Sequence, residues 1–135
     1  MTFEFTNMKK KIDLIYPHLS YKLSGLLFEV HNELGRFCKE RQYVDLMEIK
    51  LKESRWIYER EKELPINYNN KSIKGNRVDF SVENKILLEA KAKKFITKED
   101  YFQMRRYLKA SGFKLGFIVN FRNTYLKPKR IINIY

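Results

Sequence analysis

Cysteine, histidine and long apolar runs are scarce in this chain of 135 residues, and each shortage narrows what the protein can be. Its one cysteine, Cys38, cannot form an internal disulfide, which argues against a disulfide-stapled secreted domain and favours a cytoplasmic location. Its two histidines, His18 and His31, have no cysteine or second histidine at the spacing of zinc ligands, so we expect no zinc site. No apolar run approaches the roughly 18 residues of a membrane-spanning helix, so we expect no membrane association.

Glycine and proline are also few, at five and three residues, and they form no linker between domains. The sequence contains no internal repeat and no low-complexity tract, and its length suits one domain with a genuine core. The N-terminus places its charges after its apolar residues, unlike a signal peptide. We therefore expect an N-terminal extension over residues 1–17 and a single domain over residues 18–135.

Acidic residues are outnumbered by basic ones, 16 to 28, which gives a formal net charge of +12. Such an excess attracts polyanions, and nucleic acid is the commonest polyanion that a protein meets. A generic lysine-rich surface is the alternative interpretation. The charge therefore makes nucleic acid the expected partner without requiring it.

Two amphipathic helices are predicted in the first half of the chain. The first stripe of apolar residues at helical spacing comprises Leu23, Leu26, Leu27, Val30 and Leu34. The second comprises Tyr43, Leu46, Met47 and Leu51. Gly35 can end the first helix, which begins at about Ser20, and Ser54 breaks the second.

Short β-rich segments follow, because the period of the pattern changes from helical to alternating. Strands are predicted within residues 56–68 and over residues 71–75, 77–82, 85–93, 115–121 and 129–134. A turn at Asn69-Asn70 and a helix between a capping box at 97–100 and a stop at 111–112 separate them. The order, roughly ααββββαββ, predicts an α/β (α+β) fold with a mixed central β-sheet flanked by helices.

Two neighbouring strands carry the residues that point most clearly to chemistry. Glu89 and Lys91 share one face of their strand, because successive side chains of a strand point to opposite faces. A hairpin closed at residues 83–85 would place Asp79 beside them, about 5 Å away. Two carboxylates and an ammonium at one point suit a divalent cation and a phosphate, as in metal-dependent phosphodiester hydrolysis. An ordinary half-solvated strand with surface ion pairs is the alternative.

Three further residues on predicted helices are candidates for the same site. Gln103 and Tyr107 share a helix face and have polar tips that can reach a phosphate or orient a lysine. Glu40 shares a face with Tyr43 and can supply a third carboxylate. The alternatives are a surface glutamine, a half-buried tyrosine and a glutamate paired with a neighbouring cation.

The order Asp79, then Glu89-x-Lys91, then Gln103-x-x-x-Tyr107 resembles the PD-(D/E)XK nuclease superfamily, specifically its RecB-type branch. Residues 26–35, Glu40 with Tyr43, 109–121 and 126–131 resemble the small stand-alone GxxExxY proteins, so that the resemblance covers about residues 18–132. The glycine that names this group is replaced by phenylalanine at position 37, whereas Asp79, Glu89 and Lys91 are all present. The resemblance implies a restriction-endonuclease-like core.

The resemblance also implies roles for these residues. Asp79, Glu89 and the backbone carbonyl of Ala90 would bind Mg²⁺ or Mn²⁺, with Glu40 as a further ligand or water-holder. Lys91 would position or deprotonate the attacking water. Gln103 would orient Lys91 or the phosphate, and Tyr107 would contact the phosphate.

Basic residues flank the predicted site and would contact the nucleic acid backbone. They are Lys93, Lys94, Arg105, Arg106, Lys109, Lys127, Lys129 and Arg130. Phosphate contacts position a strand without specifying its sequence, and the chain shows no recognition helix or zinc finger, so we expect weak sequence specificity. Four aromatic residues are expected either to stack on unpaired bases or to lie in the core, which is the commoner fate of aromatics: Tyr101, Phe102, Phe121 and Tyr125.

The predicted function is therefore that of a metal-dependent nuclease, an enzyme that hydrolyses phosphodiester bonds, with DNA favoured as substrate. Two alternatives stay open: a non-catalytic nucleic-acid-binding protein that retains the fold, and a subunit of a DNA repair or defence assembly that needs a protein partner. A homodimer is a further possibility, because two copies can cut both strands. The sequence leaves DNA or RNA, and single or double strands, undecided.

Overall fold

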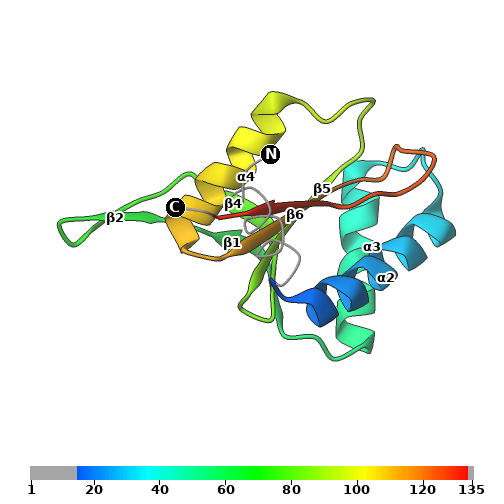
Figure 1. The fold of residues 1–135 in the computed structure, drawn as a ribbon, viewed down its shortest axis with the longest axis horizontal. Helices are drawn as coiled ribbons and strands as arrows, with labels where there is room; N and C mark the ends of the chain where they lie inside the picture. Colours follow the sequence, from blue (N-terminus) through cyan, green and yellow to red (C-terminus); the bar gives the residue numbers. More distant parts are fainter. Residues whose placement is uncertain (1–14, 134–135) are drawn as a thin grey trace, which may run out of the picture.

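The computed structural model describes residues 15–133. Figure 1 shows its helices and strands in chain order. They are α2 (Pro17–Leu34), α3 (Glu40–Glu53), β1 (Tyr58–Glu63), β2 (Ile66–Tyr68), β3 (Lys71–Ile73), β4 (Arg77–Val82), β5 (Ile86–Lys91), α4 (Lys98–Ser111), β6 (Leu115–Asn120) and β7 (Lys129–Ile132). Residues 1–14 of the predicted extension and residue 134 of the predicted last strand lie outside the described part.

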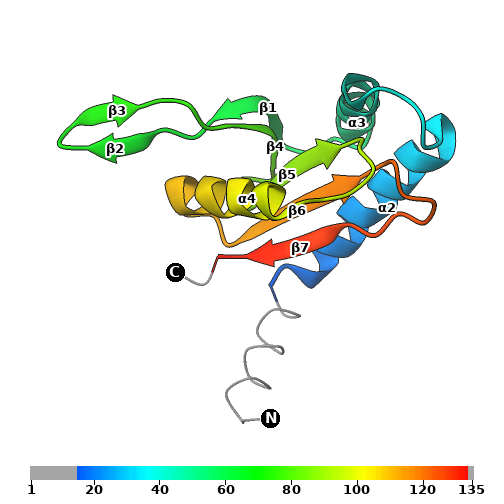
Figure 2. The same ribbon diagram turned by 90° about the horizontal axis from the view of Figure 1, so that it is seen from above.

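Within the described residues, five strands form a mixed sheet in the order β1-β4-β5-β6-β7. The pair β5–β6 is parallel and the other pairs are antiparallel. The parallel pair requires a crossover, which α4 provides (Figure 2). The predicted fold class, a mixed sheet flanked by helices, is confirmed.

The sheet has a hydrophobic core on each face. On one face, α2 and α3 pack on residues such as Phe80, Leu88 and Phe117. On the other, α4 packs on Leu87 and Ile118, whose side chains alternate with the first set. Both β5 and β6 are therefore buried on two faces, which explains their nearly continuous apolar sequences.

The local signals at the hairpin and at α4 formed as predicted. Glu83 and Asn84 both have left-handed backbone conformations, as the two central residues of a tight hairpin turn require. Thr97 and Asp100 make a capping box at the start of α4, and Gly112 follows its end in the left-handed conformation. These signals fix the register of β4 against β5 and the start of α4.

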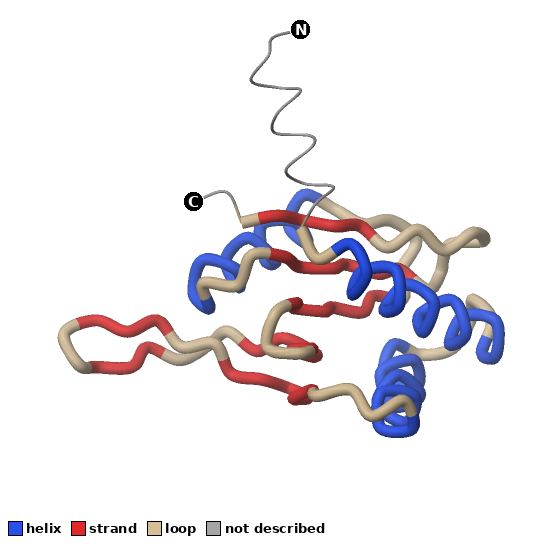
Figure 3. Tube along the Cα trace, turned by 60° about the horizontal axis from the view of Figure 1, so that its bottom comes forward, coloured by secondary structure: helices blue, strands red, loops and turns tan. Residues whose placement is uncertain are grey.

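One predicted segment differs from the structure. The stretch 56–68 forms two strands, β1 and β2, so that five strands precede α4 where the predicted order has four. Leu64 and Pro65 separate them, and β2 pairs only with β3 in a two-stranded hairpin that projects from the body of the molecule (Figure 3). A proline has no N–H to continue a ladder, which accounts for the break.

A second difference concerns the end of β5, predicted to run to Lys93 but ending at Lys91. The N–H and the carbonyl oxygen of Lys93 bond to the side-chain amide of Asn120, so the backbone of Lys93 has left the strand ladder.

None of the helices in the described residues is long and apolar enough to cross a membrane.

Two glycines offer a test of the packing of α4. A Cβ at Gly116 in β6 would lie 2.4 Å from Sδ of the buried Met104, whereas a Cβ at Gly25 in α2 would meet nothing within 4 Å. We expect Gly116→Ala to lower the free energy of unfolding by about 1–3 kcal/mol through overpacking. Gly25→Ala should raise it by about 1 kcal/mol, because alanine favours a helix over glycine. Urea denaturation measures both, and equal stability of Gly116→Ala and wild type would contradict the packing.

Candidate active site

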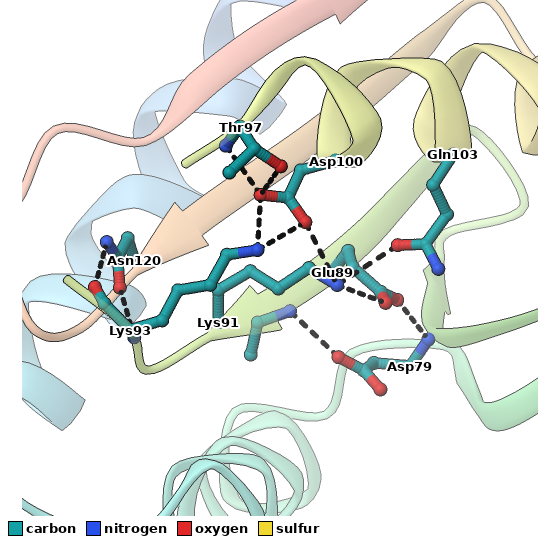
Figure 4. A network of polar contacts seen from close by, with 9 residues as sticks. Asp79, Glu89, Lys91, Lys93, Thr97, Asp100, Gln103 and Asn120 are labelled. Carbon is teal, nitrogen blue, oxygen red and sulfur yellow. Dashed lines mark hydrogen bonds and ion pairs between the residues drawn. The ribbon is translucent and has the colours of Figure 1, made fainter. Parts of the chain in front are cut away.

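At the centre of the site, the backbone hydrogen bonds between β4 and β5 are replaced by hydrogen bonds from backbone to side chains. Regular pairing runs from Val82 opposite Ile86 to Phe80 opposite Leu88. At the next position the N–H of Asp79 donates to Oε1 of Glu89 at 2.9 Å, and the N–H of Ala90 donates to Oδ2 of Asp79 at 2.8 Å (Figure 4). Each carboxylate is thus held by a backbone amide at this opening of the ladder.

The other neighbour of β4 is also distorted at this level. In the register of β1 with β4, Arg60 lies opposite Phe80 and Lys62 opposite Val78. Between them Glu61 has a φ of 52°, in the left-handed region that glutamate rarely adopts. Such a conformation costs of the order of 1–3 kcal/mol and occurs where surrounding structure enforces it. Asp79 therefore lies between two irregular stretches of strand.

The nearby positive charges do not fully balance the negative charges of Asp79 and Glu89. Glu89 is buried and Asp79 half-buried. Burial raises the pKa of Asp79, against the lowering effect of the Ala90 N–H and the Lys91 charge. Burial, and next the negative charge of Asp79, raise the pKa of Glu89 to about 7. Arg60, a second nearby cation, is already paired with two carboxylates of α3. Asp79 and Glu89 are therefore suited to bind a further cation.

Lys91 is held between β5 and α4. Its Nζ donates to Oε1 of Gln103 at 3.0 Å and lies 3.5 Å from Oε2 of Glu89. It also lies 3.7 Å from Oδ1 of Asp100. Only 15% of the side chain is exposed, so the ammonium group is fixed beside Glu89 by contacts from two elements.

Asp100 is a site residue that the sequence analysis treated only as a helix cap. Its carboxylate accepts hydrogen bonds from the N–H of Thr97 and from Nζ of Lys93. Burial alone would raise its pKa, but the bonds from Lys93 and Thr97 outweigh this and lower it. The signal in the sequence was its place in a capping box one turn before Gln103, with Lys91 and Lys93 a few residues before it.

Asn120 is a second residue that the sequence analysis missed. Its side-chain amide bonds to both backbone groups of Lys93 and accepts from the N–H of Arg122. The N–H of Phe121 donates to the carbonyl of Lys91 at 2.9 Å. A buried asparagine at the end of an apolar strand was the available signal, and its effect is to fix the chain that follows Lys91.

Glu40 and Tyr107 take different positions around this centre. Glu40 is exposed at the start of α3, and its pKa is raised first by partial burial of the carboxyl group and then by the charge of Asp79. Tyr107 is buried between α4 and the sheet, and burial followed by the charge of Glu89 raises its pKa. Both lie near the carboxylate pair, and the predicted phosphate contact of Tyr107 stays a prediction.

The predicted nucleic-acid-binding residues are not equivalent. Those with exposed side chains are Lys94, Arg105, Arg106, Lys109, Lys127 and Lys129. Lys93 is paired with Asp100, and Arg130 donates to the backbone carbonyl of Ile15, so structural contacts occupy both. Lys109 lies near the end of α4 that is remote from Lys91.

The predicted aromatic residues also divide. Phe121 is buried and stacks on Tyr43 with ring centroids 4.3 Å apart, and Tyr101 packs partly against the α4 core. Phe102 and Tyr125 are exposed. Phe121 is therefore a core residue, whereas the exposed ring of Tyr125 can contact a ligand.

The donor set fits a hard divalent cation held by few protein ligands. Asp79 and Glu89 supply carboxylate oxygens, and Mg²⁺ is commonly held by one or two carboxylates together with water and substrate phosphates. Among residues 15–133, no three histidine, cysteine, aspartate or glutamate side chains are grouped so as to hold a metal. The fit is thus to a two-carboxylate site, and the role of Glu40 as a further ligand stays a prediction.

A mixed sheet whose neighbouring strands β4 and β5 present two carboxylates and a lysine, with helices on both faces, defines a restriction-endonuclease-like protein. The chain belongs to the PD-(D/E)XK nuclease superfamily, whose family model matches residues 17–132. Its members are in general nucleases, which act on nucleic acid. The narrower resemblance to GxxExxY proteins stays a prediction.

Comparison with solved structures agrees on the fold. A structure described as "Crystal structure of SSO0001" superposes with a TM-score of 0.50, over 98% of this chain and 78% of that chain, at 19% sequence identity. At this identity the likeness concerns the fold alone. No curated protein matches the sequence.

Because the pKa of Glu89 is raised, we predict that the stability of the fold depends on pH. Because folding raises the pKa of Glu89 from 4.5 to about 7, the native state binds more protons, and stability falls as the pH rises through this window. Without metal, Glu89→Gln should melt at a higher temperature than wild type at pH 8, and the difference should vanish below about pH 4.5.

Thermal unfolding followed by circular dichroism in EDTA measures this difference. Glu99→Gln, which changes an exposed glutamate of α4, is the control and should show no such gain. Equal melting temperatures of Glu89→Gln and wild type at pH 8 would contradict the electrostatic cost.

Proposed function

We propose that this protein is a metal-dependent nuclease that hydrolyses phosphodiester bonds in nucleic acid, with DNA as the favoured substrate and weak sequence specificity of its own. The observation that carries the proposal is the pair of carboxylates, half-buried Asp79 and buried Glu89, beside the fixed ammonium of Lys91. Superfamily membership supports the reaction class, and the net charge of +12 supports a polyanionic substrate.

Asp79 and Glu89 would hold Mg²⁺ or Mn²⁺, with the backbone carbonyl of Ala90 and, after a shift, Glu40 as additional oxygens. When bound, such a cation supplies positive charge against phosphate oxygens and makes a water molecule a better nucleophile. It would also remove the electrostatic cost that raises the pKa of Glu89. Activity should therefore require both carboxylates in their charged form.

Lys91 would act on the phosphate and on the attacking water. Its ammonium group is placed by Gln103 and Glu89, so it needs no rearrangement to offset the negative charge that develops on the phosphate. Gln103 is a positioning residue in this scheme, because its Oε1 accepts a hydrogen bond from Nζ of Lys91. Asp100 holds Lys93 and leaves Lys91 with its closer partners.

Substitutions at the centre should abolish cleavage without unfolding the protein. We expect Asp79→Ala, Glu89→Ala and Lys91→Ala each to slow cleavage by at least about 10²-fold, the usual effect of removing a charge-stabilising or proton-transfer group. The assay uses labelled single-stranded, duplex and branched DNA and RNA, each with Mg²⁺, Mn²⁺ or EDTA.

Lys114→Ala is the matched control, because Lys114 is exposed and precedes β6 at the opposite end of the sheet. It should cut at the wild-type rate. A wild-type rate in any of the three centre variants would refute this site. Salt-sensitive binding without cleavage by wild type would favour the non-catalytic or partner-dependent alternatives.

A further inference from the structure

Three strongly exposed aromatic side chains lie in three different loops at one end of the sheet. Phe37, Phe95 and Tyr125 are 76%, 69% and 81% exposed. Among the other described aromatic residues, Tyr21 at 82% and Tyr68 at 67% are exposed to a similar degree, but they lie in α2 and β2 and not in these loops. Their loops connect α2 to α3, β5 to α4 and β6 to β7. Figures 1 and 2 show these loops gathered where β5 and β6 end, which is where Lys91 lies.

The loops are bonded to one another. Nε of Arg36 donates to the carbonyl of Arg122 at 2.9 Å, and Nε of Arg122 donates to the carbonyl of Arg36 at 3.2 Å. The side chain of Asn120 joins the β6–β7 loop to Lys93 in the β5–α4 loop. The aromatic residues therefore stand on one fixed rim, so that binding does not have to order three separate loops.

Cations accompany two of the three rings. The guanidinium carbons of Arg36 and Arg122 lie 5.0 and 5.6 Å from the centre of the Phe37 ring, and Nζ of Lys94 lies 5.6 Å from that of Phe95. A ligand that fits this rim offers flat π faces and negative charges close together. The bases and phosphates of a nucleic acid strand have this combination.

We propose that Phe37, Phe95 and Tyr125, called here the aromatic rim, stack on unpaired bases and make single-stranded nucleic acid, or a single-stranded end, the substrate class. The proposal rests on the proposed function in that nucleic acid is what meets the catalytic site. In a duplex the base faces are covered by neighbouring bases, so a stacking surface selects unpaired strands. The rim lies beside the site because the Phe121 N–H, in the same loop as Tyr125, bonds to the carbonyl of Lys91.

Binding of a labelled oligothymidylate of about twelve nucleotides, compared with an abasic strand of the same length and charge, tests the rim. Fluorescence anisotropy in EDTA keeps the strand intact. We expect wild type to bind the thymidylate at least about tenfold more tightly, and Phe37→Ala, Phe95→Ala and Tyr125→Ala each to weaken that binding by about tenfold. Binding of the abasic strand should not change.

Tyr21→Ala is the control for Tyr125→Ala, because Tyr21 is equally exposed but lies near the opposite end of α2 from Phe37. It should bind both strands as wild type does, and Phe37→Trp should retain the preference for bases. Because the substituted side chains are exposed, the variants should fold, and their melting temperatures check this.

Equal affinity of wild type for the two strands, or unchanged thymidylate binding in all three rim variants, would overturn the proposal. This includes the case in which a partner protein covers the rim. The two proposals fail separately. If cleavage depends on Lys91 but binding shows no preference for bases, the proposed nuclease function stands and the aromatic-rim proposal is rejected. If binding depends on bases but no cleavage occurs with Mg²⁺ or Mn²⁺, the aromatic-rim proposal stands and the nuclease function is rejected.

Discussion

The structure depends on the exchange of backbone and side-chain bonds between Asp79 and Glu89. Where a regular ladder would join two backbones, the N–H of Asp79 bonds to the carboxylate of Glu89 and the N–H of Ala90 to the carboxylate of Asp79. This exchange satisfies two backbone amides that would otherwise lose partners. It also fixes two negative charges in a partly buried place, so local folding and the chemistry of the site have one cause.

That arrangement is costly, and the surroundings compensate for only part of the cost. Burial and mutual repulsion raise the pKa of Glu89, and the single ammonium of Lys91 is shared with Gln103 and Asp100. A protein selected for stability alone would have no reason to keep such a pair. The proposed divalent cation would give the reason, because it would supply the missing positive charge and requires such oxygen ligands.

Helix α4 links this charge balance to the fold. Asp100 caps the helix through Thr97 and also neutralises Lys93, while Gln103 one turn later holds Lys91. The same helix covers Leu87 and Ile118 on the sheet. A shift of α4 would therefore disturb the core and the lysine together, which explains how a small domain keeps the site in place.

Much of this site could be predicted because its signals are local. Alternation along β5 put Glu89 and Lys91 on one face, and two left-handed turn residues brought Asp79 beside them. The residues that were missed act over long sequence distances: Asn120 bonds to Lys93 across 27 positions.

Two further features depend on the assembled molecule. The left-handed Glu61 is held beside Asp79 by the strand pairing, and its sequence carries no glycine-like signal. The loops of the rim are joined by the reciprocal bonds of Arg36 and Arg122, which are 86 positions apart. Such contacts follow from the packed fold and not from local propensity.

The most direct test of the central claim is a titration of ¹⁵N-labelled protein with Mn²⁺, followed by amide NMR spectra. A paramagnetic ion broadens the signals of nearby nuclei, so the account predicts that the amides of Asp79 and Ala90 disappear first, and that Glu89→Gln abolishes this selectivity. Uniform broadening, or broadening centred on another part of the chain, would contradict a cation site at these two carboxylates.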